Sequence, residues 1–242
     1  MNDTSITFTS DMTVELVQQM GGDAMVVAAA RVSTRGGLAN VKADPDGGEG
    51  LIRYLMKHRH GTPFEHGAAT FYIHAPIFVW REFHRHRIGF SYNEESARYK
   101  RLDPVFFVPR HGRPMMKVDD WKPGRPKFTV CDDGYAYGET RANLELSYIA
   151  AYKAYLRNLD LGIDPGLARD CLPVGIYSSC WVTCNPRSIM SFLSLRTHEP
   201  TAKFVSYPLA EIEGVARMME AIFAEHWPIT YKAFCENGRV GP

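Results

Sequence analysis

Few of the common sequence signals of function occur in this chain of 242 residues. It has no apolar run near the roughly 20 residues that a membrane-spanning helix needs. Its start, MNDTSITFTSDMTVE, lacks the basic and apolar stretches of a signal peptide. The formal net charge is +1, so no general attraction to nucleic acid or to an anionic membrane is expected. We therefore expect a cytoplasmic protein that binds neither nucleic acid nor membranes.

Cysteine is scarce and irregularly spaced. The five cysteines are Cys131, Cys171, Cys180, Cys184 and Cys235. An odd count without regular spacing does not predict a disulfide framework. Free thiols in a reducing compartment are the expectation.

Glycine-rich phosphate-binding motifs are also absent. Neither G-x-G-x-x-G nor G-x-x-x-x-G-K-[ST] occurs, so any phosphate would have to be held by side chains. Histidines are frequent between residues 58 and 86, but they form H-x-H pairs and no H-E-x-x-H motif. A zinc or iron site built on these histidines stays an open alternative.

The pattern of apolar residues predicts a mixed α and β chain dominated by helices. The expected strands are 5–9, 69–75, 105–109 and 178–184. The expected helices are 13–32, 51–60, 76–87, 144–159, 164–173, 185–196 and 208–226. An interruption of the first of these at Gly21–Gly22 stays open. Asp164 and Asn185 each precede a proline and are expected to cap helices. No repeat or linker interrupts the chain, so we expect one domain over 1–242 with a proline-rich flap at 109–127.

One short stretch, RHRIGFSYNEESARY at 85–99, is unusually rich in polar side chains. Its three arginines offer planar donors suited to phosphate. The carboxylates and the serine at 94–96 could read a polar ring by hydrogen bonds. A solvated charged face is the plain alternative, but such faces favour Lys and Glu over Arg and His.

The predicted helix 76–87 poses a geometric problem for this stretch. Residues turn by about 100° along a helix, so Arg85 and Arg87 would point to nearly opposite sides. Either the helix ends before them, or the two sides serve different ligands or different subunits. We infer from this geometry that the segment lies at an interface.

The stretch 85–99 closely resembles the signature of flavin-dependent thymidylate synthases, an Arg-His-Arg followed by Ser-x-Asn-Glu-x-Ser-x-Arg-Tyr. Further similar blocks follow the order of that family: AARVS (29–33), HGTPFEH (60–66), APIFVWREF (75–83), ARDCLP (168–173) and NPRSIMSFLSLR (185–196). The resemblance implies an α+β fold with long helices around an antiparallel or mixed sheet. It also implies a homotetramer whose active sites, each holding FAD, form at subunit interfaces.

The resemblance further implies the reaction. It is methylation of carbon 5 of dUMP to give dTMP, with methylenetetrahydrofolate as carbon donor and NADPH as reductant. A C5 methylase or hydroxymethylase acting on UMP stays open. From other classes, a metal-dependent hydrolase and a non-catalytic nucleotide-binding protein also stay open.

Site residues follow from the resemblance position by position, and no metal is among its implications. Arg196 and Ser96 are implied to be catalytic. The implied substrate-binding residues are Glu82, Arg85, Glu94, Ser96, Ala97, Arg98, Arg169 and Arg196. The implied cofactor-binding residues are Ser33, His60, Thr62, Arg85, His86, Arg87, Glu94, Asn185, Arg187, Ser191, Leu195 and His198.

The position of the cysteines bears on the mechanism. Carbon 5 of uracil is a weak nucleophile, and a cysteine thiolate added to carbon 6 is one way to activate it. No cysteine lies in the signature stretch. We therefore expect Arg196 to polarise the ring by stabilising negative charge on its carbonyl oxygens.

Overall fold

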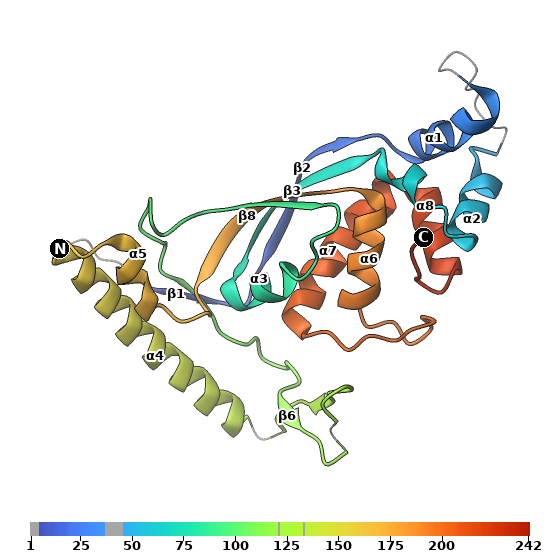
Figure 1. Cartoon of the computed structure of the whole chain (residues 1–242). Coiled ribbons are helices and arrows are strands. Elements are labelled where there is room, and N and C mark those ends of the chain that lie inside the picture. Colours follow the sequence, from blue (N-terminus) through green and yellow to red (C-terminus); the bar gives the residue numbers. More distant parts are fainter. Residues whose placement is uncertain (1–4, 37–45, 121, 133) are drawn as a thin grey trace. The chain divides into compact units, whose positions relative to one another are not determined.

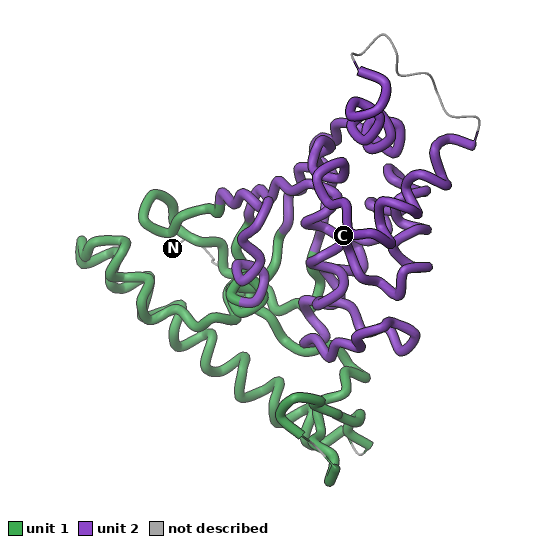
Figure 2. Tube along the Cα trace, turned by 45° about the vertical axis from the view of Figure 1, so that its right-hand side comes forward, with its two compact units in different colours: residues 1–12, 74–81, 94–179 green, residues 13–73, 82–93, 180–242 purple. Residues whose placement is uncertain are grey.

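The structure is a computed structural model that describes residues 5–36, 46–120, 122–132 and 134–242 (Figure 1). Its helices and strands confirm the mixed α+β class. The chain forms two compact units (Figure 2). Unit 1 takes its residues from Met1–Met12, His74–Arg81 and Glu94–Ser179, and unit 2 takes them from Thr13–Ile73, Glu82–Asn93 and Cys180–Pro242.

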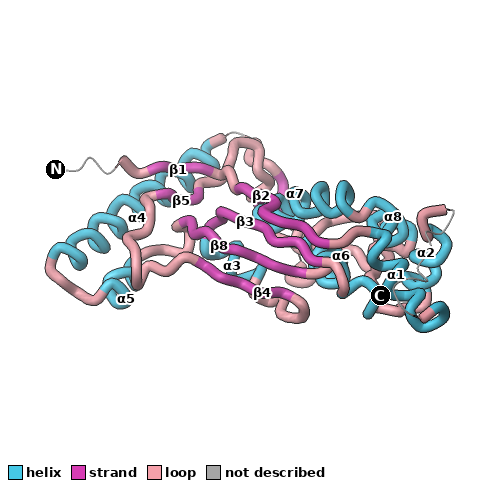
Figure 3. Tube along the Cα trace, turned by 90° about the horizontal axis from the view of Figure 1, so that it is seen from above, coloured by secondary structure: helices cyan, strands magenta, loops and turns pink. Residues whose placement is uncertain are grey.

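Unit 2 contains the greater part of a four-stranded sheet, seen from above in Figure 3. Its strand order is β2-β3-β8-β4. The bounds are β2 Thr13–Met20, β3 Ala68–Pro76, β4 Phe90–Glu94 and β8 Tyr177–Cys184. Along β3 every second residue is buried, because alternate side chains of a strand point to opposite faces. The side chains on one face of β3 are therefore buried in the core.

Helices make up the rest of unit 2. They are α1 (Asp23–Arg35), α2 (Glu49–Lys57), α6 (Pro186–Arg196), α7 (Ala210–His226), α8 (Pro228–Glu236) and the 3-10 turn η2 (Thr62–Glu65). α7 carries a buried stripe that includes Ile212, Val215, Met219 and Phe223, at the spacing of one helix face.

Unit 1 is built on the long helix α4 (Tyr135–Asp160). Three tyrosines of α4, at 148, 152 and 155, pack in one cluster with Phe106 and Ile176. The other elements of the unit are the parallel pair β1 (Thr7–Thr9) and β5 (Val105–Phe107), α5 (Pro165–Ala168) and η3 (Arg169–Cys171). A small hairpin begins within the predicted flap at 109–127 and ends just beyond it: β6 (Met116–Lys117) pairs with β7 (Phe128–Thr129).

The predicted helix 13–32 is wrong in its first half. Residues 13–20 form strand β2, and only Asp23–Arg35 is helical. The side chains of Val14 and Leu16 alternate with exposed neighbours, which is the period of a strand. Gly21 follows with φ of 84°, a left-handed conformation that separates the strand from the helix.

The helix over 76–87 is shorter than predicted. Helix α3 spans Ile77–Phe83, so Arg85 and Arg87 lie beyond its end. The first of the three alternatives therefore holds, and opposed helix faces no longer argue for an interface. The signature stretch itself contains β4, which the sequence pattern did not predict.

Candidate active site

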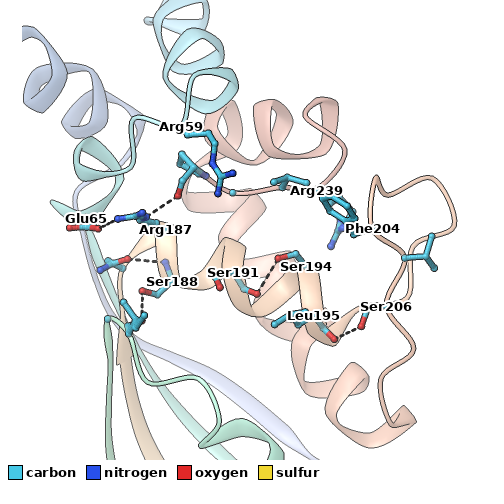
Figure 4. Close-up of a pocket in the computed structure, with 17 residues that line it drawn as sticks. Arg59, Glu65, Arg187, Ser188, Ser191, Ser194, Leu195, Phe204, Ser206 and Arg239 are labelled. Atoms are coloured by element: carbon cyan, nitrogen blue, oxygen red, sulfur yellow. Dashed lines mark hydrogen bonds and ion pairs between the residues drawn. The ribbon is translucent and has the colours of Figure 1, made fainter. Parts of the chain in front are cut away.

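A cavity of about 810 Å³ lies within unit 2 (Figure 4). It lies along α6, with further walls from residues 204–206 and 239–242. The structure brings four of the predicted cofactor residues to its wall: Asn185, Arg187, Ser191 and Leu195. All four belong to α6 or cap it.

The first turn of α6 is fixed by local chemistry. The Asn185 side chain accepts a hydrogen bond from the Ser188 amide at 2.9 Å, and Pro186 takes the first helical position, as predicted. Ser188, which is buried, donates its hydroxyl to the Ile88 carbonyl at 2.9 Å. Gly89 has φ of 69°, and a Cβ there would collide with the Ser188 hydroxyl. The loop after the Arg-His-Arg triplet thus lies directly on the start of α6.

Arg187 is held in place at the cavity wall. Its Nη1 pairs with Glu65 Oε1 at 2.5 Å, and its Nε donates to the Pro242 carbonyl at 2.8 Å (Figure 4). A Cβ at Gly61 would come within 2.5 Å of the guanidinium carbon. Glycine at 61 therefore leaves the space in which Arg187 lies.

The composition of the wall fits a cofactor with an anionic part and a planar apolar part. The charged side chains that line the cavity are three arginines, Arg59, Arg187 and Arg239, with one carboxylate, Glu65. Apolar surface comes from Ile88, Leu195 and Phe204. The volume lies within the range of about 300–1,000 Å³ usual for sites of small molecules and cofactors. Guanidinium groups are suited to phosphate oxygens and the apolar side chains to a ring system, so FAD fits these residues.

A second constellation in unit 2 joins three predicted residues, Glu82, His86 and Arg196. Arg196 Nη1 pairs with Glu82 Oε2 at 2.6 Å, and its Nη2 donates to the Glu82 carbonyl at 3.1 Å. Arg196 Nε donates to His86 Nε2 at 3.0 Å. The side chain of Arg196 is only 18% exposed, and these hydrogen bonds hold its guanidinium in place.

His86 is neutral in this arrangement. Burial, and then the positive charge of Arg196, lower the pKa of His86 to about 4. Tyr92 fixes the turn around His86. Its hydroxyl donates to the His86 carbonyl at 2.6 Å and to the Phe83 carbonyl at 3.2 Å. Burial raises the pKa of Tyr92, so its hydroxyl stays protonated as this donor.

Unit 1 has a smaller cavity of about 350 Å³. Glu94, Ala97 and Arg169 line it among the predicted substrate residues, together with Arg81 and Ser178. The buried Ser178 hydroxyl donates to Glu94 Oε1 at 2.6 Å. Arginine and fixed carboxylate in one cavity can bind a phosphate and accept from hydroxyl groups of one ligand.

Other predicted residues line neither of these two cavities: Ser33, His60, Thr62, Arg85, Arg87, Ser96, Arg98 and His198. Ser33 lies on α1 and donates to the Ala30 carbonyl at 3.0 Å. The His198 ring bonds through Nδ1 to the carbonyl of Ser206, which lines the larger cavity, at 2.8 Å. Their roles stay predictions.

Sequence reasoning did not select several wall residues. In the larger cavity these are Arg59, Glu65, Phe204 and Arg239, and in the smaller one Arg81, Asp170 and Ser178. Arg59 lies at the end of the predicted helix 51–60, directly before the HGTPFEH block. Phe204 and Arg239 carry no local signal.

Within residues 5–36, 46–120, 122–132 and 134–242, no three His, Cys, Asp or Glu side chains converge to hold a metal ion. No helix in them is long and apolar enough to cross a membrane.

Known proteins resemble this chain over almost its whole length. The chain is 50% identical to the flavin-dependent thymidylate synthase of Streptomyces avermitilis, over 100% of this chain and 98% of the relative. It is 48% identical to that of Streptomyces coelicolor, with the same coverage. A crystal structure of the UMP/dUMP methylase PolB from Streptomyces cacaoi, bound with 5-Br dUMP, matches with a TM-score of 0.90 and 45% identity, covering 98% of this chain and 100% of that one.

These matches define a class, the flavin-dependent enzymes of the thymidylate synthase type. The sequence model of the family described as thymidylate synthase complementing protein matches residues 15–229. The chain belongs to this family, which confirms the prediction made from the signature stretch.

Proposed function

We propose that this protein methylates carbon 5 of dUMP to give dTMP, with FAD as cofactor, methylenetetrahydrofolate as carbon donor and NADPH as reductant. The observation that carries the proposal is the family match over residues 15–229, together with 50% identity to a flavin-dependent thymidylate synthase. The cationic cavity along α6 supports the flavin part of the proposal.

FAD would be held by Asn185, Arg187, Ser191 and Leu195 at the wall of the larger cavity. When bound, it supplies the hydride that completes the methyl group, which no protein side chain can supply. The Asn185 side chain already caps α6, so the amide that would meet the cofactor is fixed in advance. Preformed contacts of this kind reduce the entropy lost on binding.

Arg196 would activate the uracil ring. Its guanidinium is always cationic and is held in place by Glu82 and His86. Such a preorganised cation would stabilise the negative charge that develops on a ring carbonyl. One such donor lowers a barrier by about 3 to 4 kcal/mol. His86 is neutral and accepts from Arg196 Nε, so it positions the guanidinium without adding a charge of its own. Ser96 is proposed to lie near the reacting carbon.

The nucleotide would be bound by Arg169, Glu94 and Ala97 in the smaller cavity, and by Arg85 and Arg98 from the signature stretch. Arg169 suits the phosphate, and Glu94 suits a sugar hydroxyl, because a carboxylate is an acceptor only. A homotetramer with active sites at subunit interfaces remains part of the proposal. So does a cytoplasmic location.

UMP is the second candidate substrate. The observation that favours it is the solved structure of PolB bound with 5-Br UMP, which matches this chain with a TM-score of 0.86 and 45% identity. Acceptance of UMP would require room for the ribose 2′-hydroxyl.

Turnover of dUMP and UMP, measured side by side with FAD, methylenetetrahydrofolate and NADPH, tests the proposal. We expect dTMP to form, with a higher kcat/KM for dUMP than for UMP. Product from UMP alone would move the function to the ribonucleotide. No 5-methylated product from either would contradict the proposed function.

A further inference from the structure

Arg59 occupies a backbone position that helix ends usually give to glycine. Its φ is 60°, in the left-handed region. The His60 amide bonds to the Leu55 carbonyl at 2.9 Å and the Arg59 amide to the Met56 carbonyl at 3.3 Å, which closes the end of α2 in a Schellman motif. Glycine dominates this position because any Cβ is strained there. An arginine at such a site calls for a reason beyond capping.

The side chain of Arg59 supplies that reason. It lines the cavity of about 810 Å³, and Figure 4 shows it extending from the connection after α2 toward the space beside α6. Among the described residues, its guanidinium has no hydrogen bond or ion pair. The two other arginines of the wall are paired, Arg187 with Glu65 and Arg239 with Glu220.

Charge at the wall points to the class of ligand. The ion pairs leave Arg59 as the uncompensated positive charge of the lining, at an exposed position that an anion can reach. A guanidinium presents parallel N–H donors that match two oxygens of one phosphate. The left-handed backbone at Arg59 ends the helix and directs the side chain toward the cavity.

We propose that Arg59 binds a phosphate of the diphosphate bridge of FAD. The inference rests on the proposed function, since it assigns a phosphate contact to the cofactor that the larger cavity is proposed to hold. Arg59 is not among the site residues that the signature blocks imply. It is a binding residue, and it takes no part in the transfer of carbon or hydride.

The test compares the affinity of the flavin-free protein for two probes, FAD and riboflavin, which lacks phosphate. Arg59→Gly removes the guanidinium and relieves the strain of a Cβ in the left-handed backbone, so thermal stability should stay the same or rise. Arg59→Asn is a second variant whose side chain also tolerates this conformation. Lys57→Ala is the matched control, because it removes one exposed positive charge two residues away that does not line the cavity.

Both Arg59 variants should bind FAD about 10- to 100-fold more weakly, the loss typical of a hydrogen bond to a charged group. Their affinity for riboflavin, and both affinities of Lys57→Ala, should stay at the wild-type value. FAD affinity unchanged by either Arg59 variant would overturn the inference, as would equal losses for FAD and riboflavin. Wild-type protein that binds neither flavin would overturn the proposed function as well.

Discussion

His86 links local packing to a measurable pH dependence. Its pKa in the folded protein is about 4, against 6.5 for an unperturbed histidine. As the pH falls through this window, the unfolded chain takes up a proton that the folded site does not accept, so stability is lost with falling pH. The histidine therefore favours folding at neutral pH and opposes it in acid.

We expect the unfolding temperature of the wild type to fall more between pH 7 and pH 5 than that of His86→Gln. Glutamine cannot take up a proton, so this part of the pH dependence disappears. His66→Gln, at an exposed histidine, is the control and should keep the wild-type profile. Parallel profiles for wild type and His86→Gln would contradict the neutral state of the half-buried His86.

Replacement of Arg196 tests its proposed role on the ring. Arg196→Ala should lower kcat by a factor of about 100 to 1,000, the loss typical of removing one preorganised donor. Flavin should stay bound, because Arg196 does not line the larger cavity. The visible flavin absorbance of the purified variant and its kcat provide the two measurements. Undiminished kcat would remove Arg196 from the mechanism.

Gly89 tests the close packing of the signature loop on α6. Gly89→Ala should cost more stability than Gly112→Ala. Both positions have positive φ, where alanine costs about 1 to 2 kcal/mol, but only at Gly89 would the Cβ meet Ser188. Gly89→Ala should also weaken FAD binding, since residue 89 lines the cavity. Chemical denaturation and flavin titration measure both effects, and equal losses of stability would argue against the close approach.

At the scale of the elements, helix caps explain much of what the sequence could predict. Asp164 and Asn185 each accept from an amide three residues ahead, at 3.0 and 2.9 Å, and each precedes a proline. These are local interactions, so the sequence window contains all that determines them. The helix predicted over 13–20 is wrong because Val14 and Leu16 follow the period of a strand, and the break before the following helix lies at Gly21.

Helix α8 was missed because its cap comes from a distant element. Trp227, at its N-cap position, makes no side-chain cap bond. Instead Asp23 of α1 accepts from the amides of Ile229 and Thr230 at 2.8 and 2.9 Å, and from the Thr230 hydroxyl at 2.6 Å. A cap that is 206 residues away in sequence leaves no local pattern.

This cross-element cap gives a stability prediction. Asp23→Ala should lower the free energy of unfolding by about 1 to 2 kcal/mol, the usual cost of a lost helix cap. Glu225→Ala, which removes an exposed carboxylate from α7, should change it by less than about 0.5 kcal/mol. Denaturant unfolding of both variants decides the matter, and equal effects would show that Asp23 does not cap α8.

At the scale of the whole molecule, the mechanism is proposed to work without a cysteine nucleophile. Cys180 and Cys184 are buried, and burial raises the pKa of the Cys184 thiol, which opposes formation of the reactive thiolate. The Cys171 thiol donates to the Ala168 carbonyl at 3.1 Å. Packing explains the buried pair without a catalytic role.

The variant with Cys171, Cys180 and Cys184 all replaced by alanine should keep wild-type kcat and unfold at a lower temperature. The loss of stability comes from removing two sulfur atoms from a packed core. Mass spectrometry of the wild type during turnover should show no covalent link between nucleotide and any cysteine. Such an adduct would contradict the proposed mechanism.

The site as a whole could be predicted only in part from the sequence. The signature blocks selected Asn185 and Arg187 because these residues belong to contiguous motifs. Arg59, Phe204 and Arg239 come together only when the chain folds, so each looks like an ordinary surface or core residue in sequence. The pairing of Arg196 with Glu82 spans 114 positions and had no signal at all.

Release of tritium from dUMP labelled at carbon 5 tests the central claim most directly, because methylation replaces the hydrogen at that carbon. The account predicts release that requires FAD together with methylenetetrahydrofolate and NADPH, and that accompanies formation of dTMP. Release that proceeds equally without FAD, or no release with all components present, would contradict it.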